Sequence, residues 1–200
     1  MRVFDVEQGS QEWLELRLGC PSGSQFSNLL TSTGKPSTSA ETYINQLIAE
    51  KLTGKPTEVK VTEWMQRGTE LEPLARNFYE LMTDNEVTEV GFCMHDQAQC
   101  GISPDGLIGD EGGLEIKCPA PQTHVKYLRD NKLPTQYKQQ VQGCLWITGR
   151  EWWDFVSFHE SMPVMTVRVQ RDDDYIQLLE AEVLKAVETI ETEVNRLKEM

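Results

Sequence analysis

The sequence of 200 residues has few cysteines, and their arrangement excludes two common ways of stabilising a small domain. The five cysteines are odd in number, scattered along the chain and never spaced as Cys-x-x-Cys. We therefore expect reduced thiols in a cytoplasmic compartment rather than a disulfide framework or a structural zinc site. No apolar run approaches the roughly 20 residues of a membrane span, and residues 1–5 have no signal-peptide pattern. A membrane partner is not expected.

Basic residues are also scarce. Nineteen lysines and arginines stand against 32 aspartates and glutamates, which gives a net charge of −13. A surface that is acidic throughout would repel the phosphates of nucleic acids. Much of the acid lies near the C-terminus, however, and four basic residues gather in the middle of the chain: Lys126, Arg129, Lys132 and Lys138. One face can therefore be basic if the C-terminal segment faces away from it.

The short motifs of several enzyme classes are absent. The chain has no His-Glu-x-x-His, no Gly-x-Ser-x-Gly, no phosphate-binding loop and no dinucleotide fingerprint, and its three histidines are isolated. Nothing points to a Ser/His/Asp arrangement, although its members need not be close in sequence. These absences leave the acidic residues as the most informative candidates for a site.

Hydrophobic periodicity and turn residues predict one domain over residues 1–200. The expected helices span residues 10–18, 25–30, 40–52, 62–82, 122–129, 134–148 and 172–200, the last of them long and amphipathic. The expected strands span residues 3–6, 87–94, 99–108, 114–118, 152–159 and 165–169. The second, third and fourth strands should form an antiparallel meander, and the last two should pair. The expected core residues of helix 62–82 are Trp64, Leu71, Ala75, Phe78 and Leu81.

One pattern in the middle of the chain carries the functional interpretation. Pro104-Asp105 is followed, after a gap rich in glycine, by Glu115-Ile116-Lys117. The gap predicts a turn between two strands, and alternation along the second strand places Glu115 and Lys117 on one face. The hairpin can bring Asp105 beside Glu115, and two carboxylates at one point suit Mg²⁺ or Mn²⁺. A lysine beside them can hold a water molecule or stabilise a charged transition state.

Each candidate residue also has an ordinary structural interpretation. A surface hairpin with a Glu–Lys ion pair explains the central pattern equally well. Arg17 and Ser24 lie where a helix end and a helix start can cradle a phosphate, but a solvated arginine and ordinary helix caps are favoured there. Glu72, before Pro73, and Gln140 are most simply interpreted as solvated polar residues of helices.

Several blocks of sequence, taken together and in order, resemble one family of nucleases. The blocks are residues 13–19 (Trp-Leu-Glu-Leu-Arg-Leu-Gly), Ser24, 68–75 (Gly-Thr-Glu-Leu-Glu-Pro-Leu-Ala), 103–107 (Ser-Pro-Asp-Gly-Leu), 113–119 (Gly-Leu-Glu-Ile-Lys-Cys-Pro) and 140–142 (Gln-Val-Gln). In this order they resemble the phage lambda-exonuclease type of PD-(D/E)XK nuclease, the branch of YqaJ-like viral recombinases and alkaline exonucleases. The resemblance covers residues 6–171 and favours the functional interpretation at Arg17, Ser24, Glu72 and Gln140.

The resemblance implies roles in catalysis for six positions. Asp105 and Glu115 bind Mg²⁺, for which Mn²⁺ can substitute, and the backbone carbonyl of Ile116 is a further ligand. Lys117 positions the attacking water. Glu72 assists at a second metal or orients the nucleophile, and Gln140 lines the same site.

The resemblance also implies how DNA is held. A terminal 5′-phosphate is expected at Arg17, Ser24 and Ser103. Trp13 is implied either as part of a wedge at the duplex end or as a core residue. The chain has no obvious long basic arm at its N-terminus, so the grip on the duplex ahead of the site is left open.

At the level of fold and function, the resemblance implies an α/β (α+β) protein with a restriction-endonuclease-like core, in which helices flank a central mixed sheet. The implied activity is processive digestion of one strand of linear duplex DNA, 5′ to 3′, from a 5′-phosphorylated end. The implied partners are duplex DNA ends, two further subunits in a toroidal homotrimer and a single-strand annealing protein, in the cytoplasm of a bacterial host. Two alternatives are a PD-(D/E)XK endonuclease and a non-catalytic protein that binds DNA ends.

Overall fold

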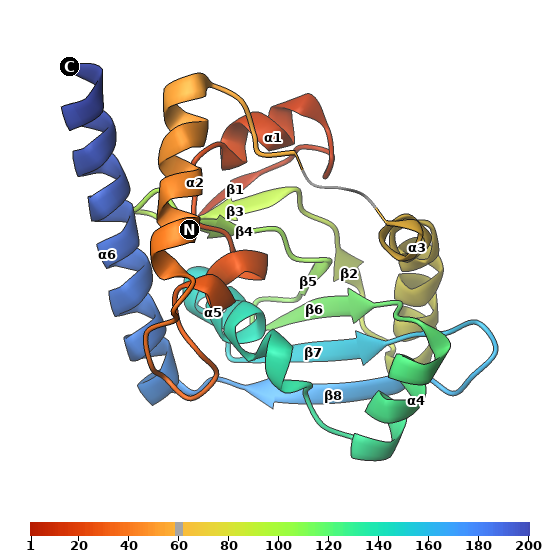
Figure 1. Cartoon of the computed structure of the whole chain (residues 1–200). Helices are drawn as coiled ribbons and strands as arrows, with labels where there is room; N and C mark the ends of the chain where they lie inside the picture. Colours follow the sequence, from red (N-terminus) through yellow and green to blue (C-terminus); the bar gives the residue numbers. More distant parts are fainter. Residues whose placement is uncertain (59–61) are drawn as a thin grey trace.

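The larger of two β-sheets forms the centre of the molecule. The computed structural model describes residues 1–58 and 62–200. Five strands follow the order β2-β5-β6-β7-β8, and their bounds are Val87–Thr88, Gly106–Ile108, Gly112–Lys117, Trp152–Ser157 and Met165–Gln170. β6 and β7 are parallel, whereas the other neighbours are antiparallel. The central mixed sheet expected from the resemblance is confirmed (Figure 1).

A smaller sheet of three strands adjoins it and corrects one prediction. Its order is β1-β3-β4, with bounds Arg2–Phe4, Phe92–Met94 and Gly101–Ile102. The antiparallel pairing of the expected meander is confirmed, but the meander is divided between two sheets, because residues 87–94 and 99–108 each contribute strands to both. The first run divides where the carbonyls of Val90 and Gly91 accept hydrogen bonds from the side chains of Gln8 and Trp13. The second divides at Pro104, which has no N–H to offer a ladder.

Helices cover both faces of the large sheet (Figure 1). The α-helices are α1 (Gln11–Arg17), α2 (Ala40–Thr53), α3 (Glu63–Thr83), α4 (Pro121–Asp130), α5 (Lys138–Thr148) and α6 (Asp173–Lys198). Two short 3₁₀ helices, η1 (Gly23–Asn28) and η2 (Thr135–Tyr137), precede α2 and α5. The α-helix expected at 25–30 is thus a 3₁₀ turn. α6 confirms the long amphipathic helix and packs on α2 and α5.

Alternation along the strands divides the core into two parts. Trp153 and Phe155 of β7 pack with α5 and α6 in the main cluster. Leu114, Ile116 and Val156 point to the opposite face and pack with Ala75 and Tyr79 of α3. The odd and even positions of the same two strands therefore belong to different layers, as a pleated strand requires.

β6 starts with two glycines because aromatic rings lie directly on them. A Cβ added to Gly113 would come within 2.2 Å of the Trp153 ring, and one added to Gly112 equally close to Trp152. Each indole therefore occupies the space that a side chain on β6 would need. This contact fixes β7 against the strand that carries the candidate carboxylate and lysine.

α3 corrects the predicted core face. Ala75 is buried and Leu71 is partly buried against the sheet, as expected, but Trp64 and Leu81 are 52% and 81% exposed. These two residues lie in the first and last turns, beyond the middle of the helix, where Ala75, Arg76 and Tyr79 are buried. Pro73 lies inside α3 without ending it. The side of α3 that faces the sheet thus carries a buried arginine, which apolar periodicity does not reveal.

Candidate active site

The β5–β6 hairpin expected from the sequence is present, and a buried arginine fixes its turn. Gly106 pairs with Leu114 and Ile108 with Gly112. Nη1 of Arg150 donates hydrogen bonds to the carbonyls of Ile108, Gly109 and Gly112, at 3.1, 2.7 and 2.7 Å. Three carbonyl acceptors satisfy much of a guanidinium that would otherwise be costly to bury. Arg150 follows α5 and is remote in sequence, so the pattern of the hairpin gave no sign of it.

Asp105 lies at the start of β5 and reaches across to the backbone of β6. Its Oδ2 accepts a hydrogen bond from the backbone N–H of Ile116 at 2.5 Å. Burial raises the pKa of Asp105, although the positive charge of Lys117, this hydrogen bond and Arg76 oppose the shift. The carboxylate is therefore held beside the strand on which Glu115 stands, as the sequence predicted.

Glu115 is only 1% exposed and has one oxygen in use and one free. Oε1 accepts a hydrogen bond from Nε2 of Gln140 at 2.6 Å and forms an ion pair with Lys117. Oε2 is buried and has no hydrogen-bond partner among the described residues. Leaving such an atom unpaired costs about 1–3 kcal/mol. Burial raises the pKa of Glu115 to about 7, and the nearby Asp105 charge adds to the shift.

Lys117 shares its face of β6 with Glu115, while Ile116 points into the opposite layer. Burial disfavours the charged form of Lys117, but the carboxylates of Glu115 and Asp105 outweigh burial and hold its pKa above the usual range. The ring of Tyr137 lies 5.6 Å from Nζ. The ammonium is therefore charged and in contact with acidic neighbours rather than free in solvent.

Glu72 reaches the same place from α3, and Arg76 one turn later connects it to the hairpin. Arg76 donates to Oε1 of Glu72 at 2.7 Å, pairs with Glu89 at 2.7 Å and donates to the backbone carbonyl of Asp105 at 3.2 Å. Burial raises the pKa of Glu72 to about 7, and the charge of Asp105 contributes. Sequence reasoning missed Arg76, although its spacing of four residues from Glu72 is that of a helical ion pair.

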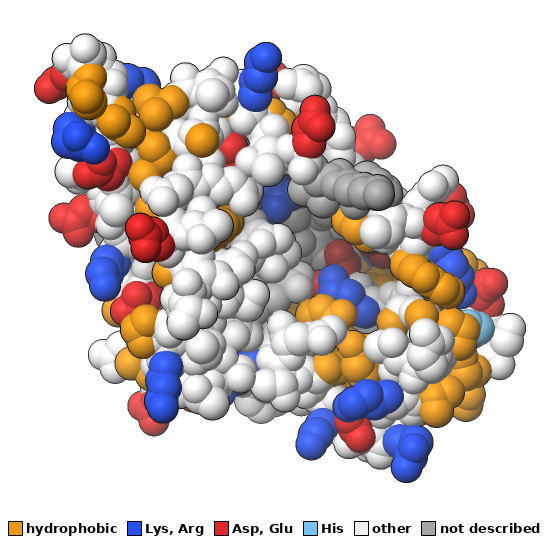
Figure 2. All heavy atoms as spheres, viewed as in Figure 1, with side chains coloured by type: hydrophobic (Ala, Val, Ile, Leu, Met, Phe, Trp, Pro, Cys, Tyr) orange, Lys and Arg blue, Asp and Glu red, His pale blue; other side chains and the backbone are white. Residues whose placement is uncertain are grey.

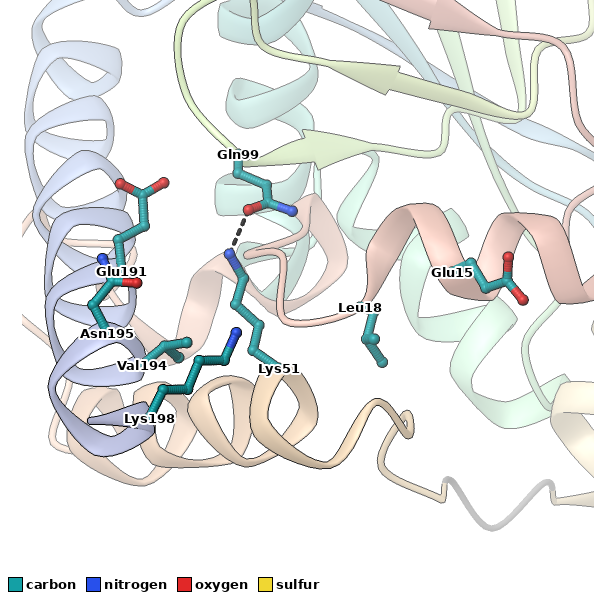
Figure 3. Close-up of a pocket in the computed structure, with 8 residues that line it drawn as sticks. All are labelled: Glu15, Leu18, Lys51, Gln99, Glu191, Val194, Asn195 and Lys198. Atoms are coloured by element: carbon teal, nitrogen blue, oxygen red, sulfur yellow. Dashed lines mark hydrogen bonds between the residues drawn. The ribbon is translucent and has the colours of Figure 1, made fainter. Parts of the chain in front are cut away.

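A cavity of about 720 Å³ opens on these groups. Glu72, Arg76 and Asp105 line it together with residues 5–9. Figure 2 shows acidic and basic side chains together in the hollow of this face. A second cavity of about 440 Å³ lies between α1, α2 and α6, where Lys51 donates a hydrogen bond to Gln99 (Figure 3). Glu72, Asp105 and Glu115 do not line this second cavity.

The donor set fits a divalent cation. Within residues 1–58 and 62–200, no three Asp, Glu, His or Cys side chains are already gathered as a complete metal site. Asp105 and Glu115 nevertheless supply hard carboxylate oxygens, and the buried free Oε2 of Glu115 is an acceptor without a donor. A cation beside this oxygen would satisfy it and favour the ionised form of both carboxylates.

The residues expected at a 5′-phosphate are only partly brought together. The Arg17 guanidinium lies 3.8 Å from the centre of the Trp13 ring, and Trp13 Nε1 donates to Ser103 Oγ at 2.9 Å. Burial lowers the pKa of Arg17. Its Nη2 donates to Ser22 Oγ at 3.2 Å, whereas Ser24 is exposed on η1.

Ser22 and Trp13, which both contact Arg17, make further contacts. Ser22 is buried, and its backbone N–H donates to the hydroxyl of Tyr43 on α2 at 3.3 Å. The sequence singled out Ser24 as a ligand of the 5′-phosphate, and the structure adds Ser22, which contacts Arg17 directly. Trp13 packs beside Cys20 and Phe92 and is partly buried, so its ring belongs to the edge of the small core.

The chain is similar in sequence and structure to known proteins. A family model described as "YqaJ-like viral recombinase domain" matches residues 12–151. The crystal structure of an alkaline exonuclease, LHK-Exo, from Laribacter hongkongensis is similar with a TM-score of 0.87 and 38% identity, over 95% of this chain and 97% of that one. The structure of LHK-Exo in complex with dAMP gives a TM-score of 0.85 at the same identity and coverage.

A more distant structure shares the fold. The phage-related exonuclease from Haemophilus somnus 129PT is 16% identical, with a TM-score of 0.66, over 89% of this chain and 96% of that one. No curated protein sequence matches the chain significantly.

Proposed function

Because the chain belongs to the YqaJ-like viral recombinase family, we propose that it is a Mg²⁺-dependent exonuclease that digests one strand of linear duplex DNA from a 5′-phosphorylated end. The family and the similarity to an alkaline exonuclease support a nuclease that acts on DNA. Processive movement, 5′-to-3′ direction and production of a 3′ overhang for strand annealing are parts of the proposal. One observation carries it: the unpaired, buried Oε2 of Glu115 stands beside Asp105 and Lys117.

Each residue of the site has a proposed role in metal binding or catalysis. Asp105, Glu115 and the Ile116 carbonyl would hold Mg²⁺, or Mn²⁺ in its place. Such a cation supplies Lewis-acid catalysis, because it lowers the pKa of a water and neutralises charge on the phosphate. The ammonium of Lys117 positions the attacking water and stabilises the charge that develops in line with it. Gln140 holds Glu115 in place, and Glu72, fixed by Arg76, orients the water or assists at a second cation.

The proposal is tested by digestion of linear duplex labelled at either end, with and without Mg²⁺. The expected result is release of 5′ nucleotides from the linear substrate only when Mg²⁺ is present. Cleavage of covalently closed circles would favour an endonuclease, since an exonuclease needs an end. Tight binding of ends without any release of nucleotides in Mg²⁺ or Mn²⁺ would favour a non-catalytic end-binding protein.

Arg17 is proposed to bind the terminal 5′-phosphate, with Ser103, Ser24 and the neighbouring Ser22. Replacing Arg17 with alanine should leave slow cleavage but remove the preference for 5′-phosphorylated over 5′-hydroxyl ends. It should also release DNA sooner, because a charge-assisted hydrogen bond is worth about 1.5–3 kcal/mol. Initial rates on matched duplexes with and without the phosphate measure the preference.

Two further variants sharpen the experiment on Arg17. Arg17→Lys keeps the charge but loses the planar fork, so an intermediate preference is expected. Arg196→Ala, at an exposed arginine of α6, should behave as the unmodified protein. An unchanged phosphate preference in Arg17→Ala would place the pocket elsewhere and return Arg17 to a structural role against Trp13.

Assembly is proposed to be a closed ring of three subunits around duplex DNA. A ring accounts for the charge of −13, because a basic lining can face the channel while acidic residues face outward. Light scattering should give three times the 22.9 kDa mass of the chain. A monomer that digests DNA processively would contradict the ring. A single-strand annealing protein is the proposed partner.

The proposed location is the cytoplasm of a bacterial host. Among the described residues, no helix combines the length and the apolar character needed to cross a bilayer. The five cysteines are all buried and free.

A further inference from the structure

A groove between α4 and the residues that follow it lies outside the candidate active site. It has a volume of about 510 Å³, and its walls include Lys126, Lys132, Thr123, Thr135 and Gln136. Ammonium, hydroxyl and amide groups of this kind donate hydrogen bonds to phosphate oxygens in protein–DNA complexes. Tyr127, Asp130 and Pro134 complete the lining of the groove.

The groove has a positive rim in a strongly acidic protein. Lys126 forms an ion pair with Asp130. The hydrogen bond from Lys126 lowers the pKa of Asp130, and the positive charges of Lys126, Lys132 and Arg129 add to this shift. The three basic side chains therefore cluster around one carboxylate. Arg129 and Lys132 form no ion pair with any residue in the described ranges. Figure 2 shows Lys and Arg side chains gathered over α4 and its following turn, on the same face as the hollow of the candidate site.

The groove lies next to the catalytic lysine. Three residues separate the end of β6 from the start of α4. Gln136, in the wall of the groove, donates to the hydroxyl of Tyr127 at 3.0 Å, and the next residue, Tyr137, places its ring 5.6 Å from Nζ of Lys117. The ten residues of α4 extend about 15 Å at 1.5 Å per residue, a length of about four base pairs.

We propose that this groove, with Lys126, Arg129 and Lys132 at its rim, binds the phosphate backbone of the duplex ahead of the cleavage site. The inference rests on the proposed exonuclease function, because only the DNA that has not yet been digested is double-stranded. Proteins that hold single strands present exposed aromatic side chains on which bases stack. The aromatic side chains of α4, His124 and Tyr127, are both buried. The groove therefore fits a duplex backbone better than a displaced single strand.

Charge reversal of the two unpaired basic residues tests the groove. In EDTA, the affinity of Arg129→Glu/Lys132→Glu for a 5′-phosphorylated duplex is compared with that of the unmodified protein over a series of salt concentrations. Each phosphate contact contributes about 0.9 to the slope of log affinity against log salt, so the slope should become shallower by about 1.8. Arg129→Ala/Lys132→Ala should lose the same amount of slope, because either substitution removes both contacts.

A matched control separates a local contact from a general change in charge. Arg196→Glu/Lys198→Glu changes the charge equally at exposed positions of α6, on the opposite side of the molecule (Figure 1). This control should keep the slope of the unmodified protein. An equal loss of slope in the control, or no loss in the groove variants, would overturn the inference.

Two further measurements distinguish duplex binding by the groove from binding of the displaced strand and from the proposed exonuclease activity. Arg129→Glu/Lys132→Glu should lose less affinity for a single strand than for a duplex of the same length. A larger loss of affinity for the single strand would assign the groove to the displaced strand and overturn the proposal. Digestion of linear duplex by the unmodified protein is measured in parallel. Its absence refutes the exonuclease, whereas unchanged binding slopes with normal digestion refute the groove alone.

Discussion

Lys117→Ala should reduce the rate of cleavage by about a hundredfold to a thousandfold on every linear duplex, with or without a 5′-phosphate. Lys117 is the cation in contact with Glu115, and its charge also acts on Asp105 and Glu72. Its removal takes away the group that positions the attacking water and stabilises the developing negative charge. Single-turnover rates at saturating enzyme isolate this step from binding.

The defect of Lys117→Ala should be one of chemistry and not of affinity. Duplex binding in EDTA should change little, because the ammonium is enclosed by carboxylates rather than displayed to solvent. Lys185→Ala, at an exposed lysine of α6, serves as the control and should keep the single-turnover rate. A Lys117→Ala variant with nearly full single-turnover activity would remove Lys117 from the mechanism.

Glu115→Gln and Asp105→Asn should each abolish metal-dependent release of nucleotides while the protein stays folded. Each variant replaces a carboxylate oxygen that a divalent cation requires with a neutral amide. Calorimetric titration with Mn²⁺ should show weaker binding than in the unmodified protein, and duplex affinity should be retained or increased because repulsion of phosphates falls. Glu111→Gln, at the exposed tip of the same hairpin, should keep full activity.

The unfolding temperature of Glu115→Gln without metal is a second measurement. Burial raises the pKa of Glu115 to about 7, helped by the charges of Asp105 and Glu72 and opposed by that of Lys117, so the ionised form is disfavoured in the folded protein. The metal-free protein therefore loses stability as pH rises from the ordinary range of a glutamate through about 7. Glu115→Gln cannot ionise and should unfold at an equal or higher temperature than the unmodified protein at pH 8. Unaltered Mg²⁺-dependent turnover in this variant would refute the metal assignment.

Local chemistry predicted the hairpin and its orientation. The glycine-rich gap indicated the turn, and alternation placed Glu115 and Lys117 on one face, where they form an ion pair. Asp105 reaches β6 because the hairpin register brings the start of one strand beside the middle of the other. These relations need only the geometry of neighbouring residues, which a sequence pattern contains.

Long-range contacts were beyond the reach of the sequence pattern. Gln140 donates to Glu115 from a helix 25 residues away, and only the resemblance to a nuclease family singled it out. Arg76 and Arg150 bind backbone carbonyls and carboxylates, and nothing in their local sequence marks them as buried. The division of the strands between two sheets depends on hydrogen bonds from distant side chains, including that of Gln8. The contact of Ser22 with Arg17 also joins two separate elements and has no motif in the sequence.

The parallel pairing of β6 with β7 has a consequence during synthesis of the chain. The strand that carries Glu115 and Lys117 pairs with Phe155 and Ser157, so its ladder is incomplete until the ribosome has added those residues. β7 is synthesised well after β6, because two parallel strands must be joined by a crossover connection. Here α4 and α5 form that crossover. A chain terminated at residue 151 would contain every proposed catalytic side chain but lack the strand that holds β6 in place. We therefore expect such a truncated product to cleave DNA poorly, because β6 would lack its parallel neighbour.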